Sequence, residues 1–325
     1  MTAKLRISSL AAAIGLSLFA TAALAQFYPT KPLKLVLPYS PGGVVDFVGR
    51  TVAQHLGDVL GQPVVADNRP GAGGIVGTDV VARAQPDGYT LLLMDPAIVI
   101  NPTLQDSVPY DLFKQLDTIS VVSSSPLVLV VAPGLNVKTF DEFVAYGKAN
   151  PGKLNFASAG IGTTPHLAGE MYKQSTGITA THIPYKGIGA SYTDMMSNKV
   201  QFAFSSIAGA LPFTTDNRVI ALATTGEARN EVYADKPTMS EAGLKGFSVD
   251  LWLAVFAPVG MPADVKTKLN AAIGTALQKP DLKAAFAKVG VSPRGTTAEA
   301  GGTFVKADYD KWKKVIVDGK IKPTN

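Results

Sequence analysis

The amino-acid sequence predicts an α/β protein with two lobes and a cleft between them. Short apolar segments typical of buried strands alternate with helical periodicity along the chain, which favours mostly parallel sheets covered by helices on both faces. The 325 residues exceed what one hydrophobic core usually organises, so two lobes are expected. Glycine-rich turns recur where a strand passes into a helix, the place where open α/β sheets bind ligands.

The first strand and helix show the pattern most clearly. Residues 33–37 form an apolar run that ends at Pro38. In residues 46–60, Val48, Val52 and Leu56 recur at helical spacing, which predicts a helix with one buried face.

Later segments continue the alternation. Thr139 and Glu142 have the spacing of a capping box, opening a helix that ends at residues 150–152. Residues 265–277 and 304–316 carry apolar helical faces near the C-terminus. Further short strands are predicted at residues 64–66, 89–94, 119–122, 127–131, 180–183, 202–205 and 220–224.

The chain is expected to cross between the lobes twice, near residues 123–126 and near residues 251–262. The first lobe then comprises residues 26–125 and 253–325, and the second comprises residues 126–252. The cleft between them is the expected binding site.

Composition excludes several functions. The absence of cysteine rules out disulfides, thiolate zinc sites and thiol nucleophiles. Three histidines, His55, His166 and His182, leave little room for a histidine-rich metal site, and we expect neither metal nor cofactor. The net charge of +5 falls to +3 without Lys4 and Arg6, which is too weak and scattered for a nucleic-acid partner.

Residues 1–25 have the features of a secretory signal peptide. Lys4 and Arg6 precede an apolar run over residues 10–24, and Ala23 and Ala25 provide the small residues of a cleavage site. This apolar run is shorter than the roughly 20 residues that a membrane anchor needs, and it ends in small residues. We therefore expect cleavage after Ala25 and a periplasmic mature protein.

The glycine-rich turn at residues 38–46, PYSPGGVVD, is a candidate anion site. The first amides of the following helix have no partner within the helix, and the helix dipole favours negative charge there. A tight strand-to-helix turn that binds nothing is the alternative.

A second turn, ASAGIGTTPHLAGE at residues 157–170, repeats the arrangement in the other lobe. Ser158, Gly160, Gly162, Thr163 and Thr164 offer hydroxyl and amide donors, and the neighbouring proline suits a first helical turn. Two such helix starts facing one cleft would suit a ligand with acceptors at each end. A turn with ordinary caps is again the alternative.

Two further motifs border the predicted cleft. Residues 67–79 lack the third glycine of a dinucleotide fingerprint, because Val76 occupies its position, and no phosphate-loop lysine follows. They are interpreted as a structural loop that edges the cleft. At residues 182–187, Tyr185 could offer its hydroxyl or ring and Lys186 positive potential, or this segment could serve packing alone.

The sequence does not favour catalysis. No G-x-S-x-G nucleophile turn occurs, and carboxylates are not paired at meaningful spacing. His166 lies near Ser158 in sequence, but in the first turn of a predicted helix, where a structural role is commoner. We expect no enzyme activity.

These motifs together resemble the extracytoplasmic solute-binding receptors of tripartite tricarboxylate transporters, the Bug (TctC-like) family. The resemblance spans essentially the whole mature chain. It is carried by LVLPYSPGGVVD (35–46), DNRPGAGG (67–74), PDGYTLL (86–92), ASAGIGTTPHLAGE (157–170), HIPYKG (182–187), PTMSEAGL (237–244) and WLAVFAPVGMP (252–262).

The resemblance implies a two-lobed periplasmic binding protein of type II-like fold. Such a receptor closes on a small organic anion, often a carboxylate, and delivers it to an integral membrane permease. We expect a monomer. An exported hydrolase of carboxylic esters or amides, and a ligand-sensing subunit of a signalling system, are the alternatives.

The family pattern also implies which residues meet the ligand. Asp46 would repel a carboxylate, so it is expected to cap or brace its loop unless the ligand carries an amine. Val44 and Val45 replace hydroxyl-bearing residues, which suggests a (di)carboxylate with an apolar spacer. The expected ligand-binding set is Tyr39, Gly42, Gly43, Val44, Val45, Asp46, Ala159, Gly160, Ile161, Gly162, Thr163, His166, Pro184, Tyr185 and Ser205.

Overall fold

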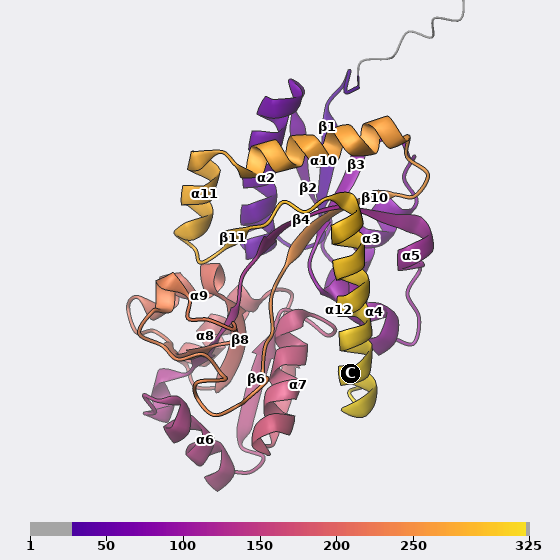
Figure 1. The fold of residues 1–325 in the computed structure, drawn as a ribbon. Coiled ribbons are helices and arrows are strands. Elements are labelled where there is room, and N and C mark those ends of the chain that lie inside the picture. The colour runs from indigo at the N-terminus through magenta and orange to yellow at the C-terminus, as the bar shows by residue number, and fades with distance from the viewer. Residues whose placement is uncertain (1–27, 323–325) are drawn as a thin grey trace, which may run out of the picture.

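The computed structural model describes residues 28–322 and contains two β-sheets with helices on their faces (Figure 1). The predicted signal segment and its cleavage point lie outside the described residues. In the described part, the strands are Leu33–Leu37 (β1), Val64–Asn68 (β2), Thr90–Met94 (β3), Leu116–Ser124 (β4), Leu127–Val131 (β5), Leu154–Ser158 (β6), Ala180–Pro184 (β7), Phe202–Ser206 (β8), Ile220–Thr224 (β9), Leu253–Pro258 (β10) and Ser292–Pro293 (β11).

The helices fill the connections between these strands. They are Val44–Leu60 (α2), Ile75–Ala82 (α3), Ala97–Leu104 (α4), Leu112–Gln115 (α5), Phe140–Ala149 (α6), Thr164–Thr176 (α7), Tyr192–Met196 (α8), Ile207–Thr214 (α9), Ala263–Leu277 (α10), Pro280–Ala287 (α11) and Ala298–Asp318 (α12). Short 3₁₀ turns cover Ala72–Gly74, Pro133–Leu135, Ile188–Ser191 and Glu231–Tyr233. No helix in residues 28–322 combines the length and apolarity needed to cross a membrane.

The expectation of mostly parallel sheets needs one correction, because each sheet contains an interior strand that runs the other way. The first sheet has the order β11-β4-β10-β3-β1-β2, and β10 is antiparallel to both β3 and β4. The second has the order β7-β6-β8-β5-β9, and β5 is antiparallel to β8 and β9. The immediate neighbours of β10, which are β4 and β3, share one direction, as do β8 and β9 beside β5, and the edge strand β11 is also antiparallel to β4. Both sheets are therefore mixed.

The reversed strands follow from how the chain passes between the sheets. Strand β4 leaves the first sheet at Ser124, and only two residues separate it from β5, which enters the second sheet at Leu127. A chain that leaves one sheet at its cleft edge enters the other from the cleft side, against the direction of the strands that end there. On the return path, Leu251 and Ser125 exchange backbone hydrogen bonds of 2.8 and 3.2 Å, which places the two connections side by side before β10 begins.

Separate apolar clusters pack on the sheets. Val48, Val52 and Leu56 of α2 are fully buried, as their spacing predicts, and pack with α10 and α11 on one face of the first sheet. In the second sheet, Phe143, Phe156 and other aromatic side chains pack beneath α6 and α7. We call the first sheet with its helices the first body and the second sheet with its helices the second body. The α2 cluster belongs to the first body alone, whereas the cluster that contains Phe156 also includes Leu92 and Met94 of β3 and so continues from one body into the other.

The long C-terminal helix α12 runs from the first sheet toward the second (Figure 1). Trp312 is buried, and its indole N–H donates to Asp308, which also accepts from Trp252 at 2.8 Å. Phe304, predicted on the buried face, is 39% exposed, although its ring meets Trp252 edge-on. At the far end, Gln174 of α7 approaches the Gly319 carbonyl at 3.4 Å, so α12 touches both bodies.

The capping box of α6 provides a test of the sequence-to-structure argument. Both of its reciprocal bonds form, between the Thr139 hydroxyl and the Glu142 amide and between the Glu142 carboxylate and the Thr139 amide. We predict that Thr139→Ala lowers the free energy of unfolding by about 1 kcal/mol in urea denaturation. Thr267→Ala, at an exposed position of α10, removes no cap and should leave the free energy of unfolding nearly unchanged. Equal losses in the two variants would contradict this account.

Candidate functional site

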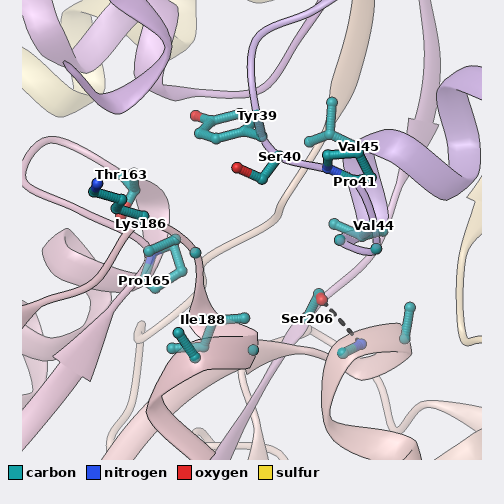
Figure 2. Close-up of a pocket in the computed structure, with 18 of the residues that line it drawn as sticks. Tyr39, Ser40, Pro41, Val44, Val45, Thr163, Pro165, Lys186, Ile188 and Ser206 are labelled. Carbon is teal, nitrogen blue, oxygen red and sulfur yellow. Dashed lines mark hydrogen bonds between the residues drawn. The ribbon is translucent and has the colours of Figure 1, made fainter. Parts of the chain in front are cut away.

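A cavity of about 510 Å³ lies between the two bodies and is lined by residues of both (Figure 2). The first body contributes the turn before α2, including Gly43 and Val44. The second contributes Ala159 and Thr163 before α7, Ile188, and Ser206 before α9. The cavity therefore lies where several strand-to-helix junctions meet, as the sequence predicts for two of them.

The turn before α2 leaves its helix amides available. Gly42 has φ +94°, a left-handed conformation that favours glycine, and Gly43 is the N-cap residue. Glycine has no side chain with which to cap, and no side-chain bond caps this helix. The amides of Val44 and Val45 belong to the first turn and have no partner within the helix. These donors lie at the cavity wall, where an anion can accept from them and gain from the helix dipole.

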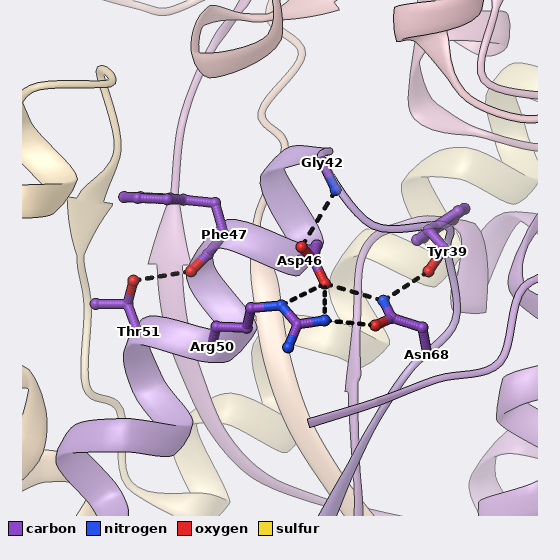
Figure 3. Close-up of polar contacts among 7 residues, drawn as sticks. All are labelled: Tyr39, Gly42, Asp46, Phe47, Arg50, Thr51 and Asn68. Carbon is purple, nitrogen blue, oxygen red and sulfur yellow. Dashed lines mark hydrogen bonds and ion pairs between the residues drawn. The ribbon is translucent and has the colours of Figure 1, made fainter. Parts of the chain in front are cut away.

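Asp46 fixes this turn from behind (Figure 3). Its carboxylate accepts from the Gly42 amide at 3.2 Å, from Arg50 Nε at 3.0 Å and from Asn68 Nδ2 at 3.0 Å. Burial alone would raise the pKa of this carboxyl, but the bonds from Arg50, Asn68 and Gly42 leave it lowered. Its side chain does not line the cavity, in agreement with the expected bracing role.

Tyr39 and Asp95 form a second polar element of the first body. The Tyr39 hydroxyl donates to Asp95 Oδ1 at 2.9 Å, and the Ala97 amide donates to the same oxygen at 3.0 Å. Burial raises the pKa of Asp95 to about 6, and these two bonds limit the rise. Sequence reasoning missed Asp95, although it follows a strand and precedes a helix, as the glycine-rich turns do.

The turn before α7 uses most of its donors internally, which differs from the expectation. The Thr163 hydroxyl donates to the Gly160 carbonyl at 2.7 Å, and the Gly160 amide donates to Ser158 Oγ at 3.0 Å. The Gly162 amide donates to Nδ1 of His166 at 3.3 Å. These bonds hold the turn in one conformation. The turn therefore contributes to the cavity mainly through its shape and through the backbone groups that these bonds do not occupy.

His166 lies behind this turn rather than in the cavity. It is fully buried and stacks on His182, with ring centroids 4.1 Å apart, and Phe156 continues the stack. His182 in turn lies 2.7 Å from the Ser158 hydroxyl. Burial lowers the pKa of His166 to about 3 and that of His182 to about 4, so both rings are neutral near pH 7.

A third helix start, which the sequence argument missed, completes the cavity. Ser206 is the N-cap of α9, accepts from the Gly209 amide at 3.1 Å and lines the cavity (Figure 2). The predicted residue, Ser205, points the other way into the core and bonds the Tyr192 hydroxyl at 2.8 Å. Successive residues of a strand face opposite sides of the sheet. The predicted position was therefore wrong by one residue, because Ser206 faces the cavity and Ser205 faces the core.

A second cavity of about 560 Å³ adjoins the first and shares Tyr39, Ser40, Ala159 and Lys186 with it. The 3₁₀ turn Ala72–Gly74 and its neighbours form one wall, so the 67–79 motif does edge the cleft.

The predicted set thus divides into three groups. Tyr39, Gly42, Gly43, Val44, Val45, Ala159 and Thr163 line the first cavity; Tyr39, Ala159, Gly160, Ile161, Pro184 and Tyr185 line the second; Asp46, Gly162, His166 and Ser205 line neither. Among residues 28–322 there is no cluster of three or more acidic or histidine side chains that could hold a metal ion.

Comparison with known proteins identifies relatives of this architecture. A family model described as tripartite tricarboxylate transporter family receptor matches residues 48–320. The protein BugT of Bordetella pertussis is 35% identical over 294 residues, covering 90% of each chain. A solved structure titled R. palustris Rpa4515 with adipate has a TM-score of 0.88 at 28% identity, covering 91% of this chain and 100% of that one. MatC (Rpa3494) from Rhodopseudomonas palustris with bound malate has a TM-score of 0.83 at 28% identity, covering 89% and 100%.

The histidine stack predicts how stability changes with pH. Both pKa values are depressed below 6.5, so the unfolded chain binds more protons than the folded one as the pH falls from about 6.5 to about 4. Stability should therefore fall in that window, with a slope of up to about 1.4 kcal/mol per pH unit for each ring. The variant His166→Asn/His182→Gln should show a shallower slope in urea unfolding at several pH values. An unchanged slope would show that the rings do not titrate in this way.

Proposed function

The chain belongs to the tripartite tricarboxylate transporter receptor family, and we propose that its cleft binds a small organic anion through a terminal carboxylate. The observation that supports this most directly is the uncapped start of α2 at the wall of a cavity between two bodies. Two related proteins were solved with carboxylates, one with adipate and one with bound malate, which agrees with this proposal.

The helix amides supply part of a useful affinity. A micromolar complex requires roughly −8 kcal/mol net. Charge-assisted hydrogen bonds contribute about 1.5–3 kcal/mol each, so three donors give about 4.5–9 kcal/mol, and burial of the ligand's apolar body has to offset the cost of closure. Val44 and Val45 provide first-turn amides at α2, and Ala208 provides one at α9.

The walls of the first cavity favour a ligand with an apolar body. Val44 and Val45 of α2 lie opposite Ile188, Pro212 and Phe213 of the second body. Apart from Asp95 and Lys186, no ionisable acid or base lines this cavity, and Asp95 is occupied by Tyr39 and Ala97. We propose a (di)carboxylate with an aliphatic or aromatic spacer.

We propose further that residues 26–125 with 253–325 form one closing body and residues 126–252 the other. The paired connections at Ser125 and Leu251 would be the hinge. The receptor family is periplasmic, so we propose export by the N-terminal signal, cleavage after Ala25, and delivery of the ligand by a monomer to membrane permease subunits.

The proposal is binding without turnover. Ser158 and His182 form a serine–histidine hydrogen bond of 2.7 Å, the kind of pair a hydrolase would need. However, the serine is fully buried, lines neither cavity and bonds its own turn through Gly160. A substrate in the cleft would not reach it. Stoichiometric binding without product from ester and amide substrates is therefore expected.

Gly43→Asp tests the proposed site. The position has φ −89° and no atom within 4 Å of an added Cβ, and aspartate is a favourable N-cap, so the variant should fold. Its carboxylate would occupy the amides of α2 and repel the ligand. We predict at least a hundredfold loss of affinity by calorimetry for whichever mono- or dicarboxylate a thermal-shift screen of residues 26–325 identifies.

The matched control is Gly302→Asp, which adds the same charge in α12, away from both cavities, where an added Cβ also meets nothing within 4 Å. Its affinity should equal that of the unmodified protein. Normal folding with unchanged binding in Gly43→Asp would place the ligand elsewhere.

A further inference from the structure

The second cavity lies directly beside the proposed carboxylate site. Ser40 and Tyr39 from the first body, and Ala159 and Lys186 from the second, line both cavities. A ligand held at the start of α2 can therefore extend past these residues without leaving the cleft. The second cavity is thus placed to receive the far end of such a ligand.

The charge in this second cavity is positive. No aspartate or glutamate lines it, and Lys186 is its single charged side chain. Within residues 28–322, Lys186 forms no ion pair or hydrogen bond, whereas Lys173 and Lys199 of the same body pair with Glu170 and Asp194. The ammonium group is therefore available to an anion in the cleft.

The opposite wall offers a neutral donor. Gln105 follows α4 of the first body, and its carboxamide has no hydrogen-bond partner among the described residues. Its Nε2 lies 3.6 Å from the ideal Cβ position of Gly162, where the two bodies come close together. The Tyr185 hydroxyl, by contrast, already donates to Asp194 at 2.7 Å and leaves its ring for packing. Each body thus contributes one unpartnered donor.

We propose that this second cavity is a subsite for a second acidic group of the ligand, with Lys186 as the specificity-determining charge and Gln105 as a supporting donor. The inference rests on the proposed carboxylate site and deepens it. It assigns the two ends of a dicarboxylate to different cavities, with the first end at the uncapped helix amides and the second at a side-chain cation. The α2 amides would accept the near carboxylate of a monoacid or a diacid alike. Lys186 would then favour those ligands that carry a second carboxylate at the far end.

The experiment compares matched pairs of acids that differ in the far carboxylate: hexanoate with adipate, and benzoate with terephthalate. Calorimetry is performed on the unmodified protein, Lys186→Met and Lys186→Arg. For the pair that binds, the unmodified protein should prefer the diacid. Lys186→Met should weaken the diacid about ten- to hundredfold and change the monoacid less than about threefold. Lys186→Arg should retain most of the preference, and added salt should reduce it.

Two further variants complete the design. Lys138→Met removes the same charge from an exposed position that lines neither cavity and should leave both affinities unchanged. Gln105→Leu should weaken the diacid more than the monoacid. A monoacid preference in the unmodified protein, or equal effects of Lys186→Met on both acids, would overturn the inference. If no carboxylate of a wider panel bound the unmodified protein, the proposed function itself would fail, which is a different result.

Discussion

The structure depends on one constraint: helix amides that lack partners must face the cleft, and the turns that present them must be held from behind. At α2 the residue that would ordinarily cap the helix is Gly43, which has no side chain, and the carboxylate of Asp46 is turned away to bind Gly42, Arg50 and Asn68. The donors are thus exposed by the same arrangement that fixes their position. We propose that an anion in the cleft replaces the missing cap.

The two bodies solve this problem with different chemistry. The first fixes its turn with charged and amide side chains, and the second fixes its turn with a buried stack of neutral rings behind the 158–163 segment. A neutral ring can accept the Gly162 hydrogen bond without adding charge near the ligand, whereas a protonated ring could not accept it. This second arrangement also links the stability of the folded protein to pH, because acid favours the unfolded chain in which the rings are charged.

Much of this could be predicted from the sequence. The first strand, the α2 face with Val48 and Val52, and the Thr139 capping box depend on local spacing, and the structure reproduces them. Strands β6 and β10 were missed: Asn155 interrupts the apolar pattern of β6, and β10 begins inside a segment interpreted as a crossing. The reversed direction of β5 and β10 is a property of the whole topology, and no local pattern encodes it.

Local sequence patterns were also insufficient to predict parts of the candidate site. The glycine-rich turns were found because their residue types are unusual, but the internal bonds that occupy Thr163 and Gly162 depend on side chains brought in by tertiary packing. Ser206 was missed by one residue because pattern alone did not fix which strand position faces the cleft. Lys186 was identified as a source of positive potential, and only the structure shows that it borders both cavities.

A crystal structure of the mature protein with its carboxylate ligand tests the central claim most directly. The account predicts carboxylate oxygens within hydrogen-bonding distance of the Val44 and Val45 amides, with the second body closed over the ligand and no covalent change. A ligand seated outside the two cavities, or a carboxylate held by side chains while these amides face solvent, would contradict it.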